Sequence, residues 1–196
     1  MRIVAGRHRG LALEAPADAR IRPTADRVRQ ALFDVLAHRF GVGAASPLTG
    51  ARVADLFCGS GALGLEALSR GAARCVFVDN DPVALALAER NMRRAREIDA
   101  ARFVLRDATR LGPATETATL AFLDPPYGAH LAGPALAALR DQGWLAPGAL
   151  VAVETGDRGR IAPPEGFVLL DARRHGRAEI AILRFGATRH EETAQP

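Results

Sequence analysis

A carboxylate, a rigid turn and an aromatic ring follow one another in Asp124-Pro125-Pro126-Tyr127, directly after the apolar run 118–123. Each proline fixes φ at about −65° and removes a backbone donor, so the turn presents carbonyl oxygens and the Asp124 carboxylate as acceptors in a preset geometry. Such acceptors suit the hydrogens of an exocyclic amine on a nucleobase, and the Tyr127 ring can stack on the face of the same base. Taken alone, the segment also fits an ordinary turn after a strand.

A glycine-rich turn opens a predicted helix further upstream, in Asp55-Leu56-Phe57-Cys58-Gly59-Ser60-Gly61-Ala62-Leu63-Gly64. Glycines there let the backbone approach a ligand closely. The spacing Gly59-x-Gly61-x-x-Gly64 matches the dinucleotide fingerprint, and Asp79, 20 residues after Gly59, stands where an acid would bind ribose hydroxyls. A nicotinamide dehydrogenase is therefore one interpretation. Asp55 argues against it, because a carboxylate before the turn would repel a pyrophosphate and attract the ammonium of an amino-acid moiety.

Length and composition limit the class of protein. The chain has 196 residues and is 48% hydrophobic, enough for one domain with a full core. It has no N-terminal apolar run of the signal-peptide type and no run of about eighteen apolar residues, so we expect a cytoplasmic protein that does not bind a membrane. The two cysteines, Cys58 and Cys75, lack metal-ligand spacing, which predicts reduced thiols and no metal.

The basic residues are all arginine, and their excess lies near the N-terminus. Residues 1–40 hold eight of the 26 arginines against four acids, while the remainder balances at 18 against 18, so the first forty residues carry the whole net charge of +4. A basic N-terminal patch predicts a polyanionic partner. The arginines that we expect to contact it are Arg7, Arg9, Arg22, Arg27 and Arg29. A solvated surface with a chance excess of charge is the alternative.

Apolar runs alternate with helical patterns after residue 50. Strands are predicted at 53–57, 75–78, 103–105, 120–123 and 150–153, and helices between them at 62–69, 82–96 and 131–142. This alternation predicts an α/β fold with a doubly wound, Rossmann-like, mostly parallel sheet. The last two strands, 166–171 and 178–185, are separated by too few residues for a helical crossover, so we expect an antiparallel hairpin at one edge of a seven-stranded sheet.

The first 45 residues are predicted to extend this core. Residues 1–14 are typical of a small β-hairpin whose tip carries arginines, and Thr24 can cap a helix with one apolar stripe. We expect a single domain over 1–186, composed of the basic extension at 1–45 and the core at 50–186. The tail at 187–196 has no apolar periodicity and is predicted to be disordered.

The order of these motifs resembles a known family. Asp55-x-Phe57-x-Gly59-x-Gly61, Asp79, Asp107 and Asp124-Pro125-Pro126-Tyr127 together are similar to class I S-adenosylmethionine-dependent amino-methyltransferases. More narrowly, segments 1–6, 22–29 and 61–71 resemble the bacterial methyltransferases of the RsmD type, which act on guanine N2 of 16S ribosomal RNA. The likeness covers residues 1 to about 186, although 173–179 follow the family's pattern only loosely.

The resemblance implies that S-adenosylmethionine is the cofactor and that Asp55, Phe57 and the 59–61 backbone hold its methionine part. Segment 22–29 would pack against the same end, with Thr24 offering a hydroxyl and an arginine a partner for the carboxylate. For Thr24 the alternative is the helix cap, and both uses can coexist.

The resemblance also implies residues for the nucleoside part of the cofactor. Asp79 would accept both ribose hydroxyls, with Asn80 beside the adenine. Asp107 would bind the adenine amine, and Ala108 would supply a backbone donor.

For catalysis, the resemblance implies that Asp124, Pro125, Pro126 and Tyr127 hold the target amine, with Asp124 also next to the cofactor. The partner would be 16S ribosomal RNA within a small-subunit assembly intermediate, and we expect a monomer. Two alternatives stay open besides the dehydrogenase. An adenine-N6 methyltransferase of DNA or RNA would use the same motif, and a non-enzymatic RNA-binding protein could retain the fold.

Overall fold

The computed structural model describes residues 1–15, 23–40, 46–126, 130–156, 161–175 and 178–186, and at 23–26 and 175 it describes the backbone only. Within these residues the helices and strands alternate as the sequence predicts. Their order is α1 (Pro23–Arg39), β1 (Arg52–Leu56), α2 (Ala62–Ser69), β2 (Arg74–Asp79), α3 (Pro82–Ala95), a 3-10 turn (Ile98–Ala100), β3 (Ala101–Leu105), β4 (Ala118–Leu123), α4 (Ala132–Asp141), β5 (Leu145–Thr155), β6 (Phe167–His175) and β7 (Ala178–Phe185).

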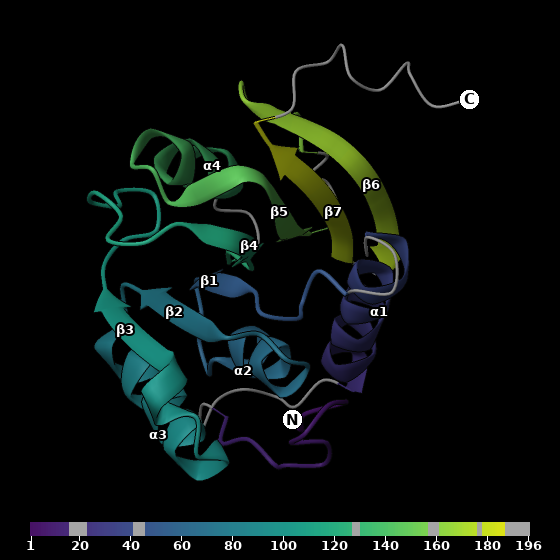
Figure 1. Ribbon diagram of the computed structural model, residues 1–196, viewed down its shortest axis with the longest axis vertical. Helices are drawn as coiled ribbons and strands as arrows, with labels where there is room; N and C mark the ends of the chain where they lie inside the picture. The colour runs from purple at the N-terminus through teal and green to yellow at the C-terminus, as the bar shows by residue number, and fades with distance from the viewer. Residues whose placement is uncertain (16–22, 41–45, 127–129, 157–160, 176–177, 187–196) are drawn as a thin grey trace.

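The strands form one seven-stranded sheet in the order β3-β2-β1-β4-β5-β7-β6 (Figure 1). The strands from β3 to β5 are parallel to one another, whereas β7 is antiparallel to both β5 and β6. The expected doubly wound sheet with an antiparallel edge hairpin is therefore confirmed. β7 lies between β5 and β6, so β6 alone forms this edge of the sheet.

Several strands are longer than the sequence pattern predicts, and β5 and β6 exceed it most. β5 begins at Leu145 rather than at residue 150, because Leu145 pairs with Ala118 at the start of β4. Pro147 and Gly148, whose residue types favour turns, lie inside this strand next to an irregularity in its pairing with β4. β6 continues to His175, because its last residues pair with the start of β7.

Helices cover both faces of the sheet. α1, α2 and α3 lie on one face and α4 on the other (Figure 1). On the first face, Phe33 of α1 packs against Phe122 of β4 with ring centroids 5.3 Å apart, and Met92 of α3 belongs to the same core. On the second face, Leu136 and other residues of α4 pack on β4 and β5. Because side chains alternate along a strand, successive residues of each strand face opposite helix layers.

The N-terminal hairpin lies where the sequence predicts it, and its outermost hydrogen bond runs from Leu13 N–H to Met1 O over 3.0 Å. It contains a single antiparallel bridge, between Arg2 and Ala12, and the backbone N–H of Ile3 donates to Leu11 O over 3.0 Å. Its tip packs on the end of α2, where Arg7 N–H donates to Ser69 O over 2.8 Å. The hairpin therefore packs against the core domain and is not a separate arm.

Helix α1 begins two residues earlier than a cap at Thr24 requires. Its first residue is Pro23, so Thr24 lies within the first turn and not at the position that precedes the helix. Proline is favoured at the first helical position because its missing N–H would have no intrahelical partner there. The cap expected at Thr24 is thus a wrong prediction of the helix start, and the Thr24 side chain lies outside the described residues.

Candidate functional site

An acidic residue lies at the carboxyl end of every parallel strand. Across the sheet these residues are Asp107 after β3, Asp79 in β2, Asp55 in β1, Asp124 after β4 and Glu154 in β5. Asp55 is level with Phe122 of β4, so Asp124 lies two residues further toward the edge. Glu154 is level with Asp124, because β4 and β5 pair in register up to the preceding residue of each. The acids therefore form a row along one edge of the sheet.

Four of these acids share one face of the sheet. The strand residues two positions before them, Phe77, Val53, Phe122 and Ala152, all belong to the core beneath α1, α2 and α3. Because side chains alternate along a strand, Asp79, Asp55, Asp124 and Glu154 point to this same face. In open α/β sheets, ligands bind at the carboxyl ends of strands where the strand order reverses, which here is β1 between β2 and β4.

The turn after β1 is built around unusual backbone angles. Phe57, Gly59 and Gly61 have φ of 57°, 52° and 75°, a region that costs energy for residues other than glycine. A methyl group added at Gly61 would come within 3.1 Å of Ala88, whereas one added at Gly59 would meet nothing within 4 Å. Gly61 therefore packs against the protein, while the space above Gly59 is open for a ligand.

Two acids hold this turn in place. Asp55 Oδ2 accepts a hydrogen bond of 2.9 Å from the N–H of Gly64 in the first turn of α2. Asp79 Oδ2 accepts one of 2.9 Å from Gly59 N–H. Ser60 is buried, and its carbonyl accepts from Asn91 Nδ2 of α3 over 2.9 Å. β1, β2 and α3 thus jointly position the glycine backbone.

Asp55 is a buried carboxyl in an acidic environment. It is 1% exposed. Burial raises its pKa well above the usual range, the hydrogen bond from Gly64 lowers it, and the charges of Asp124 and Asp79 raise it further. A cation bound beside it would favour the ionised form. Burial and neighbouring charge likewise raise the pKa of Cys58, so its thiol is not an activated nucleophile.

The acids on the β2 and β3 side are more accessible. Asp79 is half-buried, and Asn80 after it is exposed. Asp107 is half-buried and accepts hydrogen bonds of 2.8 Å from both the N–H and the hydroxyl of Thr109, which lower its pKa. Ala108 is buried beside it. These groups offer acceptors along one side of the glycine turn.

Asp124 is exposed to solvent and has a raised pKa. Its side chain is exposed and Pro125 behind it is buried. Surrounding protein raises the pKa of Asp124 to about 7, with a contribution from Glu154. The predicted neighbour Tyr127 lies outside the described residues.

The donor set fits an S-adenosylmethionine-type cofactor. The turn with the open space at Gly59 is bonded to an acid suited to an ammonium, Asp55, and to an acid suited to hydroxyl groups, Asp79. A dinucleotide would place a pyrophosphate against this turn, where the Asp55 carboxylate would repel it. The geometry therefore favours a cationic amino-acid moiety over a pyrophosphate.

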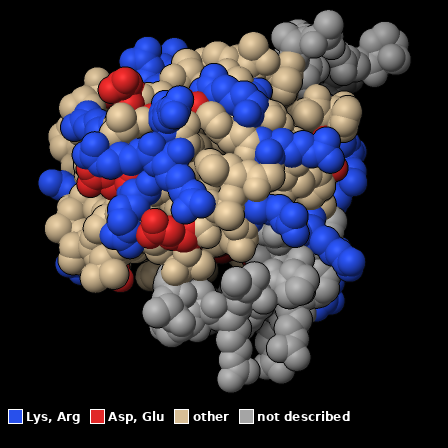
Figure 2. Space-filling view, turned by 90° about the horizontal axis from the view of Figure 1, so that it is seen from below, with Lys and Arg blue, Asp and Glu red and all other residues tan. Residues whose placement is uncertain are grey.

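The predicted arginines divide into exposed and buried positions. Arg9 and Arg27 are exposed. Arg7 is exposed too, but its Nε lies 2.6 Å from Glu97 Oε1. Figure 2 shows basic side chains across the face that contains the hairpin and α3, with acidic side chains between them. Arg22 lies outside the described residues.

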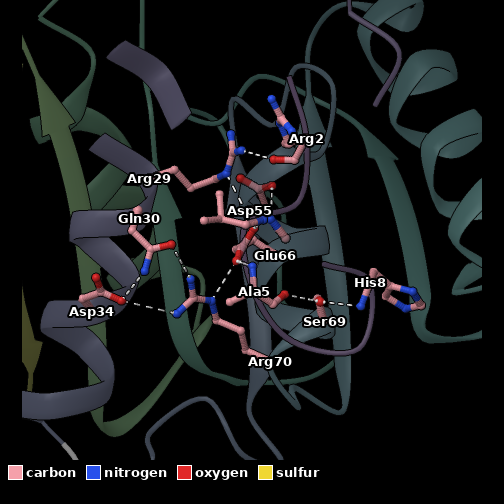
Figure 3. A network of polar contacts seen from close by, with 12 residues as sticks. Arg2, Ala5, His8, Arg29, Gln30, Asp34, Asp55, Glu66, Ser69 and Arg70 are labelled. Atoms are coloured by element: carbon pink, nitrogen blue, oxygen red, sulfur yellow. Dashed lines mark hydrogen bonds and ion pairs between the residues drawn. The ribbon is translucent and has the colours of Figure 1, made fainter. Parts of the chain in front are cut away.

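Arg29 does not belong to this exposed set. It is 5% exposed, its Nη2 donates to Arg2 O, and its Nε lies 3.7 Å from Glu66 Oε2 (Figure 3). A phosphate could not reach it without displacing these contacts. The prediction that Arg29 binds RNA is therefore wrong, because Glu66 of α2 already compensates its charge inside the protein.

Sequence analysis missed two functional candidates. Glu66 is fully buried and accepts hydrogen bonds from Val4 N–H (2.8 Å), Ala5 N–H (3.0 Å) and Arg70 Nε (2.8 Å), which fixes the hairpin to α2 (Figure 3). No local signal distinguishes it from an ordinary helix acid. Glu154 could have been found, because it follows an apolar strand just as Asp79 and Asp124 do.

Among the residues described, no helix is long and apolar enough to cross a membrane. Within the same ranges, no group of three or more histidines, cysteines or acids could hold a metal ion.

Comparisons with known proteins agree with this geometry. The family model for conserved hypothetical protein 95 matches residues 1–184. Ribosomal RNA small subunit methyltransferase D of Escherichia coli strain K12 is 35% identical over 158 residues, 79% of this chain and 74% of that protein. The protein of the same name from Haemophilus influenzae is 31% identical over 180 residues, 90% and 89% of the two chains. The solved structure of Escherichia coli yhhF is similar with a TM-score of 0.78 and 30% identity, over 96% of this chain and 99% of that one.

Proposed function

The chain belongs to the conserved hypothetical protein 95 family and is a class I methyltransferase of the RsmD type, and we propose that it methylates the exocyclic N2 amine of a guanine in small-subunit ribosomal RNA. The observation that carries this proposal is the exposed Asp124 carboxyl at the end of β4, in line with the acids Asp55 and Asp79 around the glycine turn. The E. coli and H. influenzae relatives bear the name ribosomal RNA small subunit methyltransferase D.

S-adenosylmethionine is the proposed cofactor, and when bound it supplies a methyl group on a sulfonium. Asp55, Phe57 and the 59–61 backbone hold the methionine part, with Thr24 of α1 at the same end. Asp79 accepts the ribose hydroxyls through lone pairs not used by Gly59. Asn80, Asp107 and Ala108 surround the adenine.

Asp124 and the Pro125 carbonyl oxygen orient the target amine. The lone pair of guanine N2 is delocalised into the ring, so the amine is a poor nucleophile. Acceptors that hold both amine hydrogens out of the ring plane favour the pyramidal form that can attack. Orientation of this form in line with the methyl group supplies much of the acceleration, and the Asp124 carboxylate stabilises positive charge that develops on nitrogen.

The RNA presents the base outside a stack, flipped or in a loop, where Tyr127 stacks on it and Pro126 keeps the turn rigid. Arg7, Arg9, Arg22 and Arg27 contact phosphates. The substrate is 16S ribosomal RNA within a small-subunit assembly intermediate, and the enzyme acts as a monomer.

Transfer of a labelled methyl group to fractionated ribosomal RNA tests this function. Digestion to nucleosides should yield N2-methylguanosine from the small-subunit RNA alone, at a single mapped nucleotide. N6-methyladenosine as the product would replace the proposal by the adenine-N6 alternative. Calorimetry should show binding of S-adenosylhomocysteine without competition from NAD, and the opposite result would restore the dehydrogenase interpretation.

A further inference from the structure

Glu154 has no role in the chemistry described so far, yet it stands next to the acid that performs it. It is half-buried near the end of β5, level with Asp124 at the end of the neighbouring strand β4. Both side chains point to the face that α1, α2 and α3 cover. The strand register therefore places two carboxyl groups side by side where the target base would enter.

The electrostatics agree with this proximity. After burial, the charge of Glu154 is what raises the pKa of Asp124, so the two carboxyl groups influence each other at short range. Two neighbouring carboxylates attract a ligand edge that carries two neighbouring hydrogen-bond donors. They oppose an edge that places a lone pair against one of them.

Guanine and adenine differ in this property. On its Watson–Crick edge, guanine presents the N1–H donor directly beside the N2 amine. Adenine presents an amine beside N1, which carries a lone pair and no hydrogen. Enzymes that act on an unstacked base read this edge through hydrogen bonds.

We infer that Glu154 is the residue that selects guanine, by accepting the N1–H of the base while Asp124 holds the adjacent N2 amine. This inference rests on the proposed function and names the residue that determines its specificity. With adenine, the N1 lone pair would face the Glu154 carboxylate, and the two acceptors would repel each other. A site that sets an acceptor against the wrong substrate's lone pair rejects that substrate far more strongly than an apolar pocket does.

A base analogue separates this contact from the amine chemistry. 2-Aminopurine keeps the amine on the same ring carbon but has no hydrogen on N1 and no oxygen at position 6. 7-Deazaguanine keeps both the amine and N1–H. Each analogue would be ligated into small-subunit ribosomal RNA at the mapped nucleotide, and kcat/KM for methyl transfer would be measured against the guanine RNA.

The wild-type protein should use the 2-aminopurine RNA at least about 100-fold less well than the guanine RNA, and the 7-deazaguanine RNA within about threefold. Glu154→Gln should lose activity on guanine. Its amide can donate to N1 of 2-aminopurine, so the discrimination should fall to about tenfold or less. Binding of S-adenosylhomocysteine and the melting temperature should stay at the parent values.

Glu179→Gln is the matched control. Glu179 of β7 is level with Thr155 at the same edge of the sheet, but it precedes Ile180, whose side chain lies in the core beneath α1, so it points to the opposite face. This variant should keep the wild-type discrimination.

Three outcomes would overturn the inference. Equal kcat/KM of the wild-type protein for the 2-aminopurine RNA and the guanine RNA would overturn it, and no variant is needed for this test. A Glu154→Gln protein with the wild-type ratio, or a Glu179→Gln protein with the same loss of discrimination, would also do so. If wild-type protein makes N2-methylguanosine but Glu154→Gln leaves the ratio of kcat/KM for guanine RNA to that for 2-aminopurine RNA unchanged, only this inference is wrong. If wild-type protein makes another product, the proposed function itself is wrong.

Discussion

The Asp79 carboxylate accepts a hydrogen bond of 2.9 Å from the backbone N–H of Gly59, which joins the end of β2 to the turn that follows β1. Its other oxygen accepts from Asp81 N–H over 3.0 Å. Asp79 therefore shapes the glycine turn, and each of its oxygens can accept one further hydrogen bond from a ribose hydroxyl. Loss of the side chain should weaken cofactor binding in two ways, because the glycine turn loses its support and the ribose hydroxyls lose their acceptors.

Asp79→Ala should weaken binding of S-adenosylhomocysteine by about 1.5–3 kcal/mol, the scale for losing hydrogen bonds to a charged acceptor. Calorimetry measures this directly. Asp79→Asn should lose less, because its amide oxygen can still accept from Gly59. Asp81→Ala is the control, since Asp81 caps α3 by accepting from Val83 N–H and should affect stability rather than affinity. Unchanged affinity in Asp79→Ala would argue against this cofactor site.

Asp124 should separate catalysis from cofactor binding. Asp124→Ala should leave S-adenosylhomocysteine affinity nearly intact and reduce methyl transfer by orders of magnitude, because the lost interaction is strongest in the transition state. Asp124→Asn keeps one acceptor oxygen and should retain some activity. Single-turnover transfer at saturating cofactor is the measurement. Full activity of the alanine variant would show that the Asp-Pro-Pro segment is only a structural turn and does not hold the amine.

Methyl transfer should also depend on pH through Asp124. The group must be ionised to accept the amine hydrogens, and its pKa is raised to about 7, so the rate should rise with pH between about 6 and 8 and level off above. Of the described charged groups, Glu154 from β5 raises the pKa of Asp124, and Asp124 in turn raises the pKa of Asp55 from β1. Removal of the Glu154 charge in Glu154→Gln should move this rise to lower pH. A pH–rate profile without a rise in this window would contradict the assignment.

Local sequence signals were sufficient to find most of the proposed site. Asp55, Asp79 and Asp124 each follow an apolar run, and a parallel sheet gathers the ends of such runs at one edge whatever lies between them. The role of Arg29 could not be found in this way, because its partner Glu66 approaches it only after α1 packs on α2. The start of β5 was missed for a similar reason, since pairing with β4 overrides the turn tendency of Pro147-Gly148.

Glu66 should be essential for stability. It is fully buried between Arg29 and Arg70 and holds the backbone of Val4 and Ala5. Glu66→Ala removes the acid that faces the buried Arg29 and one of the two acids beside Arg70, and loss of one member of a buried ion pair costs about 3–5 kcal/mol. Urea unfolding should show this loss. Glu89→Ala, which removes an exposed partner of Arg93 in α3, should change the free energy of unfolding by less than about 1 kcal/mol. Similar losses in the two variants would contradict the role of Glu66.

The exposed arginines should contribute to RNA binding in proportion to their freedom to reach a phosphate. Arg9→Ala and Arg27→Ala should each reduce the slope of log affinity against log salt by about one unit for a true phosphate contact, whatever the RNA sequence. Arg7→Ala should have a smaller effect, because Glu97 already compensates its charge.

Arg29→Ala serves as the internal comparison, since it removes the same type of side chain from a position that is buried against Glu66. It should lower the free energy of unfolding and leave the salt slope of the folded fraction unchanged. Filter binding over a range of salt concentrations, with S-adenosylhomocysteine affinity as the check on folding, distinguishes the two cases. If Arg9→Ala and Arg27→Ala leave the slope at the parent value, these side chains form a solvated surface, and the basic N-terminus has no part in holding the RNA.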